Sequence, residues 1–180
     1  GRFKDEKSVL NQVEKLLKEG ATFIDIGAYS SRPGADFVSE EEELKRLIPI
    51  VNAVVNNFPE SLISIDSFRS GVIKTAIESG AAIVNDISGG QQDPLMFETV
   101  GALGVPYIMM HMRGTPQTMQ KMTDYSGVVK EVYTYFSKRI ELAKTQQIKD
   151  IILDLGFGFS KTLEQNFELL GMLDYYKNLN

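Results

Sequence analysis

The sequence predicts an α/β fold organised around a parallel β-sheet, and three observations lead to this class. Short apolar segments of strand length alternate with longer amphipathic segments along the whole chain. The short segments are apolar at nearly every position, as parallel strands covered on both faces are. A polar residue ends every expected strand, which is where functional groups gather in parallel β/α folds.

Six amphipathic segments are expected to form helices, because each repeats apolar residues at a spacing of three or four. Gly20 is suited to end the first helix. Ser39 and Glu42 form a capping-box pattern at the start of the second, and the acidic run 40–43 lies in its first turn, where the helix dipole favours negative charge. We therefore interpret that run as structural. The expected helices cover residues 5–19, 40–57, 69–79, 93–103, 126–146 and 162–174.

Five apolar and partly β-branched segments between these helices are expected strands. They cover residues 21–27, 62–66, 82–86, 105–110 and 151–154. A doubly wound sheet of five strands would suit a chain of 180 residues, whereas a β/α barrel usually takes eight strands and about 250 residues. The first helix follows no strand and the last precedes none, so the pattern favours a segment of a larger alternating fold.

Composition narrows the possible functions. Hydrophobic residues make up 43% of the chain and charged residues 24%, as in ordinary globular domains, and no apolar run approaches the roughly 20 residues that a membrane span needs. There is no cysteine and His111 is the single histidine, which excludes disulfides, thiolate sites and multi-histidine metal sites. The net charge of −5 argues against a nucleic-acid partner.

The polar residues at the strand ends predict one pocket at the C-terminal edge of the sheet. They are Asp25, Asp66, Asn85 with Asp86, His111 after Met110, and Asp154. Carboxylates and a carboxamide with no His, Cys or Lys partner do not suit a nucleophilic triad. They suit recognition of the N–H and NH₂ edge of a flat heterocycle, and carboxylates also stabilise a developing cation.

These residues stand in motifs that resemble the dihydropteroate synthase family. The matching segments are residues 25–35, 64–67, 85–90, 109–114 and 154–161, in family order and spacing. Arg32-Pro33-Gly34 is the most specific element. Leu155 stands where the family usually has Pro, Tyr29 where Glu is common, and Ser31 where Thr is common.

The resemblance implies an eight-stranded TIM-type β/α barrel, of which residues 1–180 would be a single segment running from strand 2 to helix 6, without the first strand and the last two. It implies condensation of 4-aminobenzoate with 6-hydroxymethyl-7,8-dihydropterin diphosphate in folate biosynthesis, sensitivity to sulfonamides, a cytoplasmic location and a possible homodimer. Mg²⁺ is the expected cofactor, held by an Asn that would precede residue 1, so no residue of this sequence is expected to bind the metal.

The resemblance also assigns roles to individual residues. Asp66 is expected to stabilise the cationic methylene, and Arg32 to offset negative charge on the diphosphate. The expected pterin-binding groups are Asp66, Asn85 and Asp154, and the residues lining that pocket are Ile87, Met110, Gly158 and Phe159. The loop residues Ser31, Arg32 and Pro33 are expected to close over the aminobenzoate and the leaving diphosphate.

Simpler interpretations stand beside these. Met109 should face the helices, His111 should make a local hydrogen bond, Arg69 should be solvated at a helix start, and Lys161 is as easily solvent-exposed as ligand-facing. Two other functions are open: a methyltetrahydrofolate–corrinoid methyltransferase on the same barrel, and a fragment that only binds pterin or a partner protein. We expect little synthase activity from the isolated chain.

Overall fold

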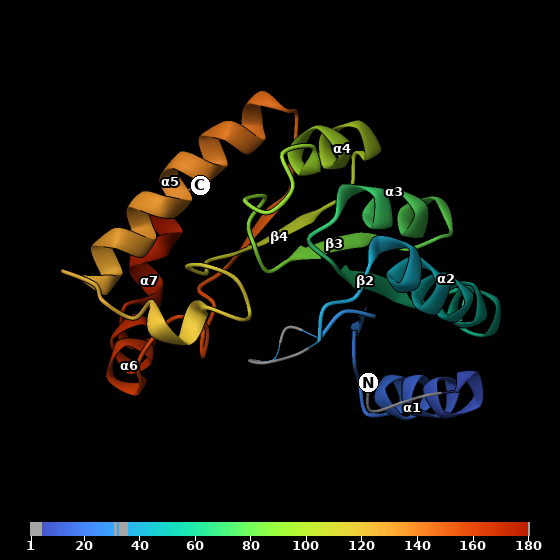
Figure 1. Ribbon diagram of the computed structural model, residues 1–180. Coiled ribbons are helices and arrows are strands. Elements are labelled where there is room, and N and C mark those ends of the chain that lie inside the picture. Colours follow the sequence, from blue (N-terminus) through green and yellow to red (C-terminus); the bar gives the residue numbers. More distant parts are fainter. Residues whose placement is uncertain (1–4, 31, 33–35, 180) are drawn as a thin grey trace.

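The computed structural model describes residues 5–30, 32 and 36–179 (Figure 1). The strands are β1 (Phe23–Ile26), β2 (Leu62–Asp66), β3 (Ile83–Asp86), β4 (Tyr107–Met110) and β5 (Ile151–Asp154). The helices are α1 (Glu6–Lys18), α2 (Glu40–Asn57), α3 (Ser70–Glu78), α4 (Met96–Leu103), α5 (Val128–Thr145), α6 (Leu163–Gly171) and α7 (Leu173–Tyr176). Two 3₁₀ turns, η1 (Met119–Lys121) and η2 (Lys177–Leu179), complete the elements.

The sheet is parallel throughout and its strands lie in the order β1-β2-β3-β4-β5. Each strand therefore pairs with the next one along the chain. A doubly wound sheet would need a point where this order reverses, so that alternative is wrong for the described part of the chain. Helices α1 to α5 curve around one side of the sheet in Figure 1, which is the winding of a β/α barrel.

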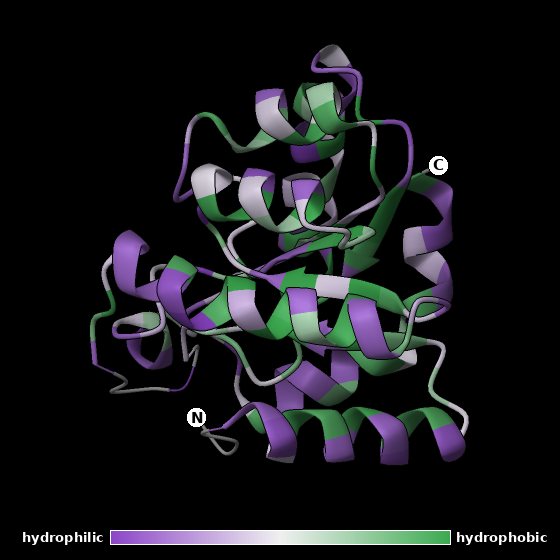
Figure 2. Ribbon diagram, turned by 90° about the vertical axis from the view of Figure 1, so that its right-hand side faces the viewer, coloured by the Kyte–Doolittle hydropathy of each residue, from purple (hydrophilic) through white to green (hydrophobic). Residues whose placement is uncertain are grey.

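The two faces of the sheet differ in burial. On the helix side, residues such as Ile65, Val84 and Met109 are fully buried against the inner faces of the helices, and Figure 2 shows the strands as the more hydrophobic layer. On the other face, Phe23 is 50% exposed and Ile152 is 48% exposed. The expectation of strands buried on both faces is therefore wrong at these positions, because the helices of the described chain pack on one side.

Side-chain caps are present at the starts of α1, α2 and α6. Thr162 and Gln165 form the complete reciprocal capping box at α6. At α2 only half of the expected box forms: Ser39 accepts the Glu42 amide at 3.2 Å, while the Glu42 carboxylate pairs with Arg46 one turn later. The single helix expected over 162–174 is interrupted near Gly171, a residue with low helix propensity, so α6 and α7 are separate elements.

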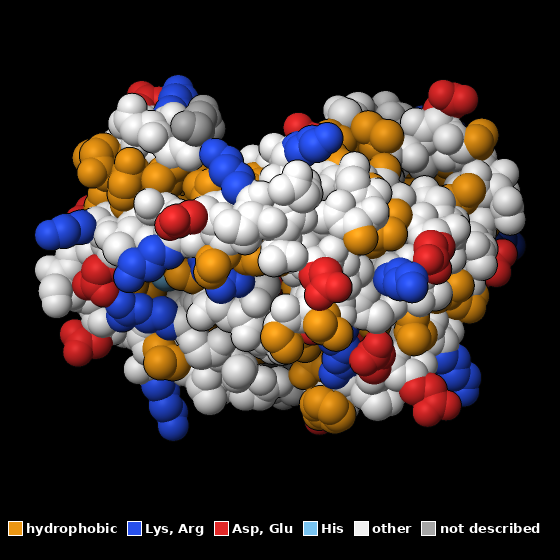
Figure 3. Space-filling view, turned by 90° about the horizontal axis from the view of Figure 1, so that it is seen from above, with side chains coloured by type: hydrophobic (Ala, Val, Ile, Leu, Met, Phe, Trp, Pro, Cys, Tyr) orange, Lys and Arg blue, Asp and Glu red, His pale blue; other side chains and the backbone are white. Residues whose placement is uncertain are grey.

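Two surface properties bear on function. None of the helices in the described ranges is long and apolar enough to cross a membrane. On the face seen in Figure 3, Lys and Arg side chains are interspersed with Asp and Glu side chains and form no basic stripe.

Candidate functional site

The strand ends place five of the predicted polar or pocket residues on the open face of the sheet. Side chains alternate between the two faces of a strand. In β1 and β2 the buried Ile24 and Ile65 lie on the helix side, so their neighbours Asp25 and Asp66 lie on the open face. The strand register places Asp66 beside Asn85 and Met110 beside Asp154. These groups therefore line one edge of the sheet, as the sequence predicts.

Asp25, Asp66 and Asn85 form an acidic cluster at the ends of β1, β2 and β3. The Asn85 side-chain amide lies 3.3 Å from both carboxylate oxygens of Asp25 and donates to them. Gly27 follows β1 beside Asp66, and a Cβ at Gly27 would lie 3.0 Å from the Asp66 Cβ and 3.2 Å from its Oδ2. A glycine at this position leaves room for the Asp66 carboxylate.

Asp66 is the most perturbed acid of the cluster. Burial raises its pKa to about 7, and the negative charges of Asp25, Asp86 and Glu43 add to the rise. No cation forms a salt bridge with Asp66 among the described residues. Near neutral pH its carboxyl can therefore be ionised or protonated, and it gains from any ligand that brings N–H donors or positive charge.

An apolar shelf lies next to the acidic cluster. It consists of the buried residues Ile87, Met110, Met112 and Met119, with Phe68 and Phe159 packed against them. Ile87 follows β3, Met110 ends β4 and Phe159 lies in the loop after β5, so three successive strands contribute. Methionine and aromatic side chains adapt to flat aromatic rings. Acids beside such a shelf suit a planar heterocycle with a donor edge.

The loop after β5 is folded tightly behind Asp154. Asp154 Oδ1 accepts the Gly156 amide at 2.8 Å, which leaves its second oxygen for other donors. Gly158 has a φ of +81° and open space at its Cβ position, and its amide donates to Asn166 at 2.9 Å. The left-handed backbone favours glycine at this position, although the open space would admit a side chain.

Two of the predicted strand-end residues face away from the open face of the sheet. Asp86 is fully buried on the helix side, where it accepts hydrogen bonds of 2.7 Å from Tyr107 Oη and from the amides of Ser88 and Gly90. It braces the turn after β3. The reason is the two-residue period of a strand, since Asn85 and Asp86 are adjacent and must point to opposite faces.

His111 also lies on the helix side. It is 3% exposed and its ring packs edge-on against Tyr135, with 4.7 Å between ring centres. The expected local hydrogen bond is absent, since Nδ1 has no partner among the described residues. Burial lowers the pKa of His111 to about 3, with Lys161 and Arg113 adding to the effect, so the ring is neutral.

The sequence suggested that Arg69 is solvated at a helix start, and this expectation is wrong. Its guanidinium donates to Glu43 Oε2 at 2.6 Å and to the Val38 carbonyl at 2.7 Å, and Ser67 donates to the other Glu43 oxygen at 2.7 Å. Glu43 is fully buried. The acidic run at the start of α2 is structural, as predicted, but Glu43 acts through this buried ion pair as well as through the helix dipole.

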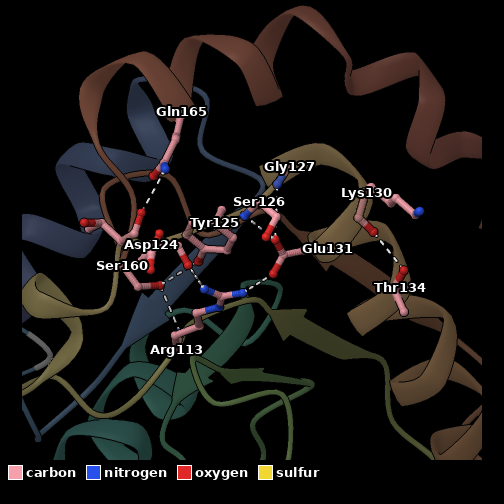
Figure 4. A network of polar contacts seen from close by, with 11 residues as sticks. Arg113, Asp124, Tyr125, Ser126, Gly127, Lys130, Glu131, Thr134, Ser160 and Gln165 are labelled. Carbon is pink, nitrogen blue, oxygen red and sulfur yellow. Dashed lines mark hydrogen bonds and ion pairs between the residues drawn. The ribbon is translucent and has the colours of Figure 1, made fainter.

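The loops after β4 and β5 are joined by a network around Arg113 (Figure 4). The Arg113 amide donates to Ser160 Oγ at 2.9 Å, while its guanidinium bonds the Asp124 carbonyl and the Glu131 carboxylate. The guanidinium also lies 3.7 Å from the centre of the Tyr125 ring. Arg113 is thus committed to the protein and does not face a ligand.

The predicted loop after β1 is described only in part. Ser31 and Pro33 lie outside the described residues. Arg32 is exposed, and its amide lies 3.4 Å from Ser30 Oγ. No three acidic or histidine side chains of the described residues gather into a possible metal site. Asp25 and Asp66 supply only two carboxylates, and Asn85 turns its NH₂ group toward Asp25, so these residues do not fit a Mg²⁺ site.

Sequence reasoning missed several members of this region. The apolar shelf also contains Phe68, Met112 and Met119, which lie outside the strands. Outside a strand, no periodic pattern in the sequence predicts which way a side chain points. Lys161 is buried rather than exposed. The strand register that brings Asp25 to Asn85 depends on strand pairing, which one sequence does not reveal.

Comparison with known proteins gives a consistent result. Residues 1–180 match the model of the family described as pterin binding enzyme. A dihydropteroate synthase of a Synechocystis species is 42% identical over 181 residues, covering 99% of this chain and 62% of that protein.

Two solved structures extend the likeness to three dimensions. The Yersinia pestis dihydropteroate synthase in complex with a sulfonamide drug superposes with a TM-score of 0.93 at 35% identity, covering 98% of this chain and 64% of that one. The Xanthomonas albilineans dihydropteroate synthase with 4-aminobenzoic acid gives 0.90 at 33% identity, covering 99% and 65%. The chain thus spans slightly less than two thirds of the length of each.

Proposed function

The chain belongs to the pterin binding enzyme family. On this premise we propose that it has the function of a dihydropteroate synthase. The observation that carries the proposal is the juxtaposition of Asp66, Asn85 and Asp154 with the shelf of Ile87, Met110 and Phe159. Acceptors on an edge beside an apolar shelf match a pterin, which is flat and carries N–H and NH₂ donors on one side.

The reaction assigns Asp66 a role in charge stabilisation. The bond between the pterin methylene and the diphosphate oxygen breaks, pyrophosphate leaves with the electron pair, and positive charge develops on the methylene. The amine of 4-aminobenzoate then forms the new carbon–nitrogen bond and loses a proton. A carboxylate without a cationic partner stabilises that developing charge most, and Asp66 has acids as its charged neighbours.

Binding requires the other acceptors to be held in place. Asn85 is oriented by its hydrogen bonds to Asp25, and Asp154 by the Gly156 amide. Their free oxygens are proposed to accept from the pterin edge, while Met110 and Phe159 contact its ring and Gly158 leaves space above it. Such pre-positioning lowers the ordering cost of binding.

The diphosphate and aminobenzoate side is assigned to the loop with Ser31, Arg32 and Pro33. Support comes from Arg32, which is exposed, whereas Arg69, Arg113 and Lys161 are all bonded to the protein. Mg²⁺ remains the proposed cofactor on the diphosphate, although the described residues do not fit its binding.

Further properties are part of the same proposal. Sulfonamide sensitivity and 4-aminobenzoate binding are supported by the related Yersinia and Xanthomonas structures. The interspersed surface charges and the net charge of −5 support the absence of a nucleic-acid partner. A cytoplasmic location, the absence of a membrane partner and a homodimer are proposed with them.

Isothermal titration of the chain with dihydropterin diphosphate and with methyltetrahydrofolate tests this function. We expect saturable binding of the first and at least about tenfold weaker binding of the second, a difference of ~1.4 kcal/mol. Binding of methyltetrahydrofolate alone would instead support the corrinoid methyltransferase. Pyrophosphate release on adding 4-aminobenzoate identifies a synthase, and we expect the isolated chain to show it only at a low rate.

A further inference from the structure

Lys161 is a buried lysine whose three N–H donors all meet backbone carbonyls. Its side chain lies just after the loop that follows β5, and the residue is 8% exposed. Nζ lies 3.0 Å from the Gly156 oxygen, 3.0 Å from the Phe159 oxygen and 3.2 Å from the His111 oxygen. The protonated group has three donors, so in that form none is left for a ligand.

The three carbonyls belong to the two walls of the proposed pterin pocket. His111 directly follows Met110, whose side chain is part of the apolar shelf. Gly156 and Phe159 begin and end the turn that follows Asp154, and that turn is closed by the Phe159 amide donating to the Gly156 carbonyl at 3.0 Å. Lys161 thus connects the end of β4 to the loop after β5.

Packing around this connection leaves little freedom. A Cβ at Gly156 would lie 2.1 Å from the His111 carbonyl oxygen and 3.3 Å from Lys161 Nζ. Ser160 has a φ of +49°, an uncommon conformation for a residue with a side chain. The left-handed conformation suits Gly156 and Gly158 but is unfavourable at Ser160, and the bonds from Lys161 to the carbonyls offset that local cost.

Charge also links Lys161 to the site. The carboxylate of Asp154 attracts the ammonium, and Arg113 on the neighbouring loop repels it, while burial lowers the pKa of Lys161 to about 7. When it is protonated, the ammonium of Lys161 is attracted by the Asp154 carboxylate. It offsets part of the charge of a carboxylate that has no cation bonded to it on the ligand side among the described residues.

We propose that Lys161 is a positioning residue for the pterin, which fixes Asp154 and Phe159 relative to Met110 through the carbonyls of His111, Gly156 and Phe159. The inference rests on the proposed function for the identity of the ligand. It goes beyond that function in assigning the spacing of the two pocket walls to one buried cation that does not touch the substrate.

The test compares Lys161→Met, which keeps the length of the side chain and removes the donors, with Lys161→Gln, which keeps two donors, and with the exposed control Lys149→Met. Affinity for dihydropterin diphosphate is measured by calorimetry, and amide hydrogen exchange is followed over residues 155–161. We expect about tenfold weaker binding for Lys161→Met and a smaller loss for Lys161→Gln. The exchange of the Phe159 amide should rise in the same order, and Lys149→Met should match the unmodified chain.

A chemical rescue separates positioning from general stability. The chain has no cysteine, so Lys161→Cys introduces a unique thiol, which is alkylated in denaturant before refolding. Aminoethylation restores an ammonium at nearly the lysine position, whereas carbamidomethylation gives a neutral group. Recovery of pterin affinity and of slow exchange with the first reagent alone supports the proposal.

Three results would decide against Lys161 or against the ligand. Binding by Lys161→Met within twofold of the unmodified chain overturns the positioning role. Equal affinity of the two alkylated forms overturns the role of the charge. If the unmodified chain binds no pterin, the proposed function fails instead, and the exchange data still show whether Lys161 holds the loop.

Discussion

The acidic edge at the ends of β1 to β3 differs from the cationic loops after β4 and β5 in how its charged side chains are partnered within the protein. At the acidic edge, Asp25 and Asp66 are partnered by one amide and by like charges. In the loops, Lys161 and Arg113 bond to carbonyls and to Glu131. The acids are left for a ligand, and the cations hold the protein together.

This difference explains where binding energy comes from and where it does not. A group already satisfied by the protein gains little from a ligand, whereas a poorly satisfied acid gains the full hydrogen bond or ion pair. The acidic edge is thus suited to recognise the donors of a pterin. The described cations around the pocket, Arg32 excepted, are unsuited to recognise a diphosphate.

The largest effect on stability is expected at the buried ion pair of Glu43 with Arg69. Glu43→Ala should lower the free energy of unfolding by about 3–5 kcal/mol, because it leaves the Arg69 charge and the Ser67 hydroxyl without their buried partner. Urea unfolding measures the change. Glu42→Ala, one residue earlier in the same helical turn, removes an exposed ion pair and should cost less than about 1 kcal/mol. Equal costs for both variants would contradict the distinction.

A second effect concerns the ionisation of Asp66. Its pKa is raised in the folded protein, so its contribution to stability is full below the unfolded value of 3.8 and is lost as pH rises through about 7. At pH 8, Asp66→Asn should therefore raise the free energy of unfolding by up to about 4 kcal/mol, measured by urea unfolding. At pH 4 the variant and the unmodified chain should differ little. Asp25→Asn should remove part of the same pH dependence, since Asp25 contributes to the rise.

The opposite result, a stabilisation by Asp66→Asn that is larger at pH 4 than at pH 8, would show that the pKa of Asp66 is not raised. The same variant should weaken pterin binding, because an amide replaces a carboxylate acceptor. A gain in stability combined with a loss in affinity is the sign of a residue held for the ligand.

The smallest effect is expected in the cationic loops at the surface. Arg113→Leu should cost about 1–2 kcal/mol in unfolding free energy, because the lost bonds to Asp124 and Glu131 and the contact with Tyr125 are partly solvated. Lys130→Leu, an exposed substitution on α5, is the control and should change stability by less than about 0.5 kcal/mol. A loss above 3 kcal/mol would place Arg113 with the buried pairs.

The sequence allowed the sheet and the edge of the site to be predicted, because both depend on local pattern. All five strands occur where apolar runs of strand length end in polar residues. The facing direction of Asn85 against Asp86, and of Met110 against Met109 and His111, follows from the two-residue period. Applying that period to every strand end would have removed Asp86 and His111 from the predicted pocket.

What could not be predicted depends on partners far apart in the chain. Glu43 meets Arg69, 26 residues later, and Lys161 meets the carbonyl of His111, 50 residues earlier. A lone charged residue in a sequence carries no signal of such a partner, and on average it is exposed. For this reason the expectation of a solvated Arg69 is wrong, and the sequence does not decide between an exposed and a ligand-facing Lys161.

The sequential strand order has a consequence for how the protein forms on the ribosome. Every strand pairs with one that has already emerged, so each strand–helix–strand unit can close as soon as its second strand is available. The pairing of β1 with β2 can form before the residues of β5 are made, yet the proposed pterin pocket needs residues from both ends of this order. Lys161 emerges after all five strands, so we expect pterin binding to appear abruptly with its release from the exit tunnel. Until then the nascent chain would hold a growing sheet without a ligand site.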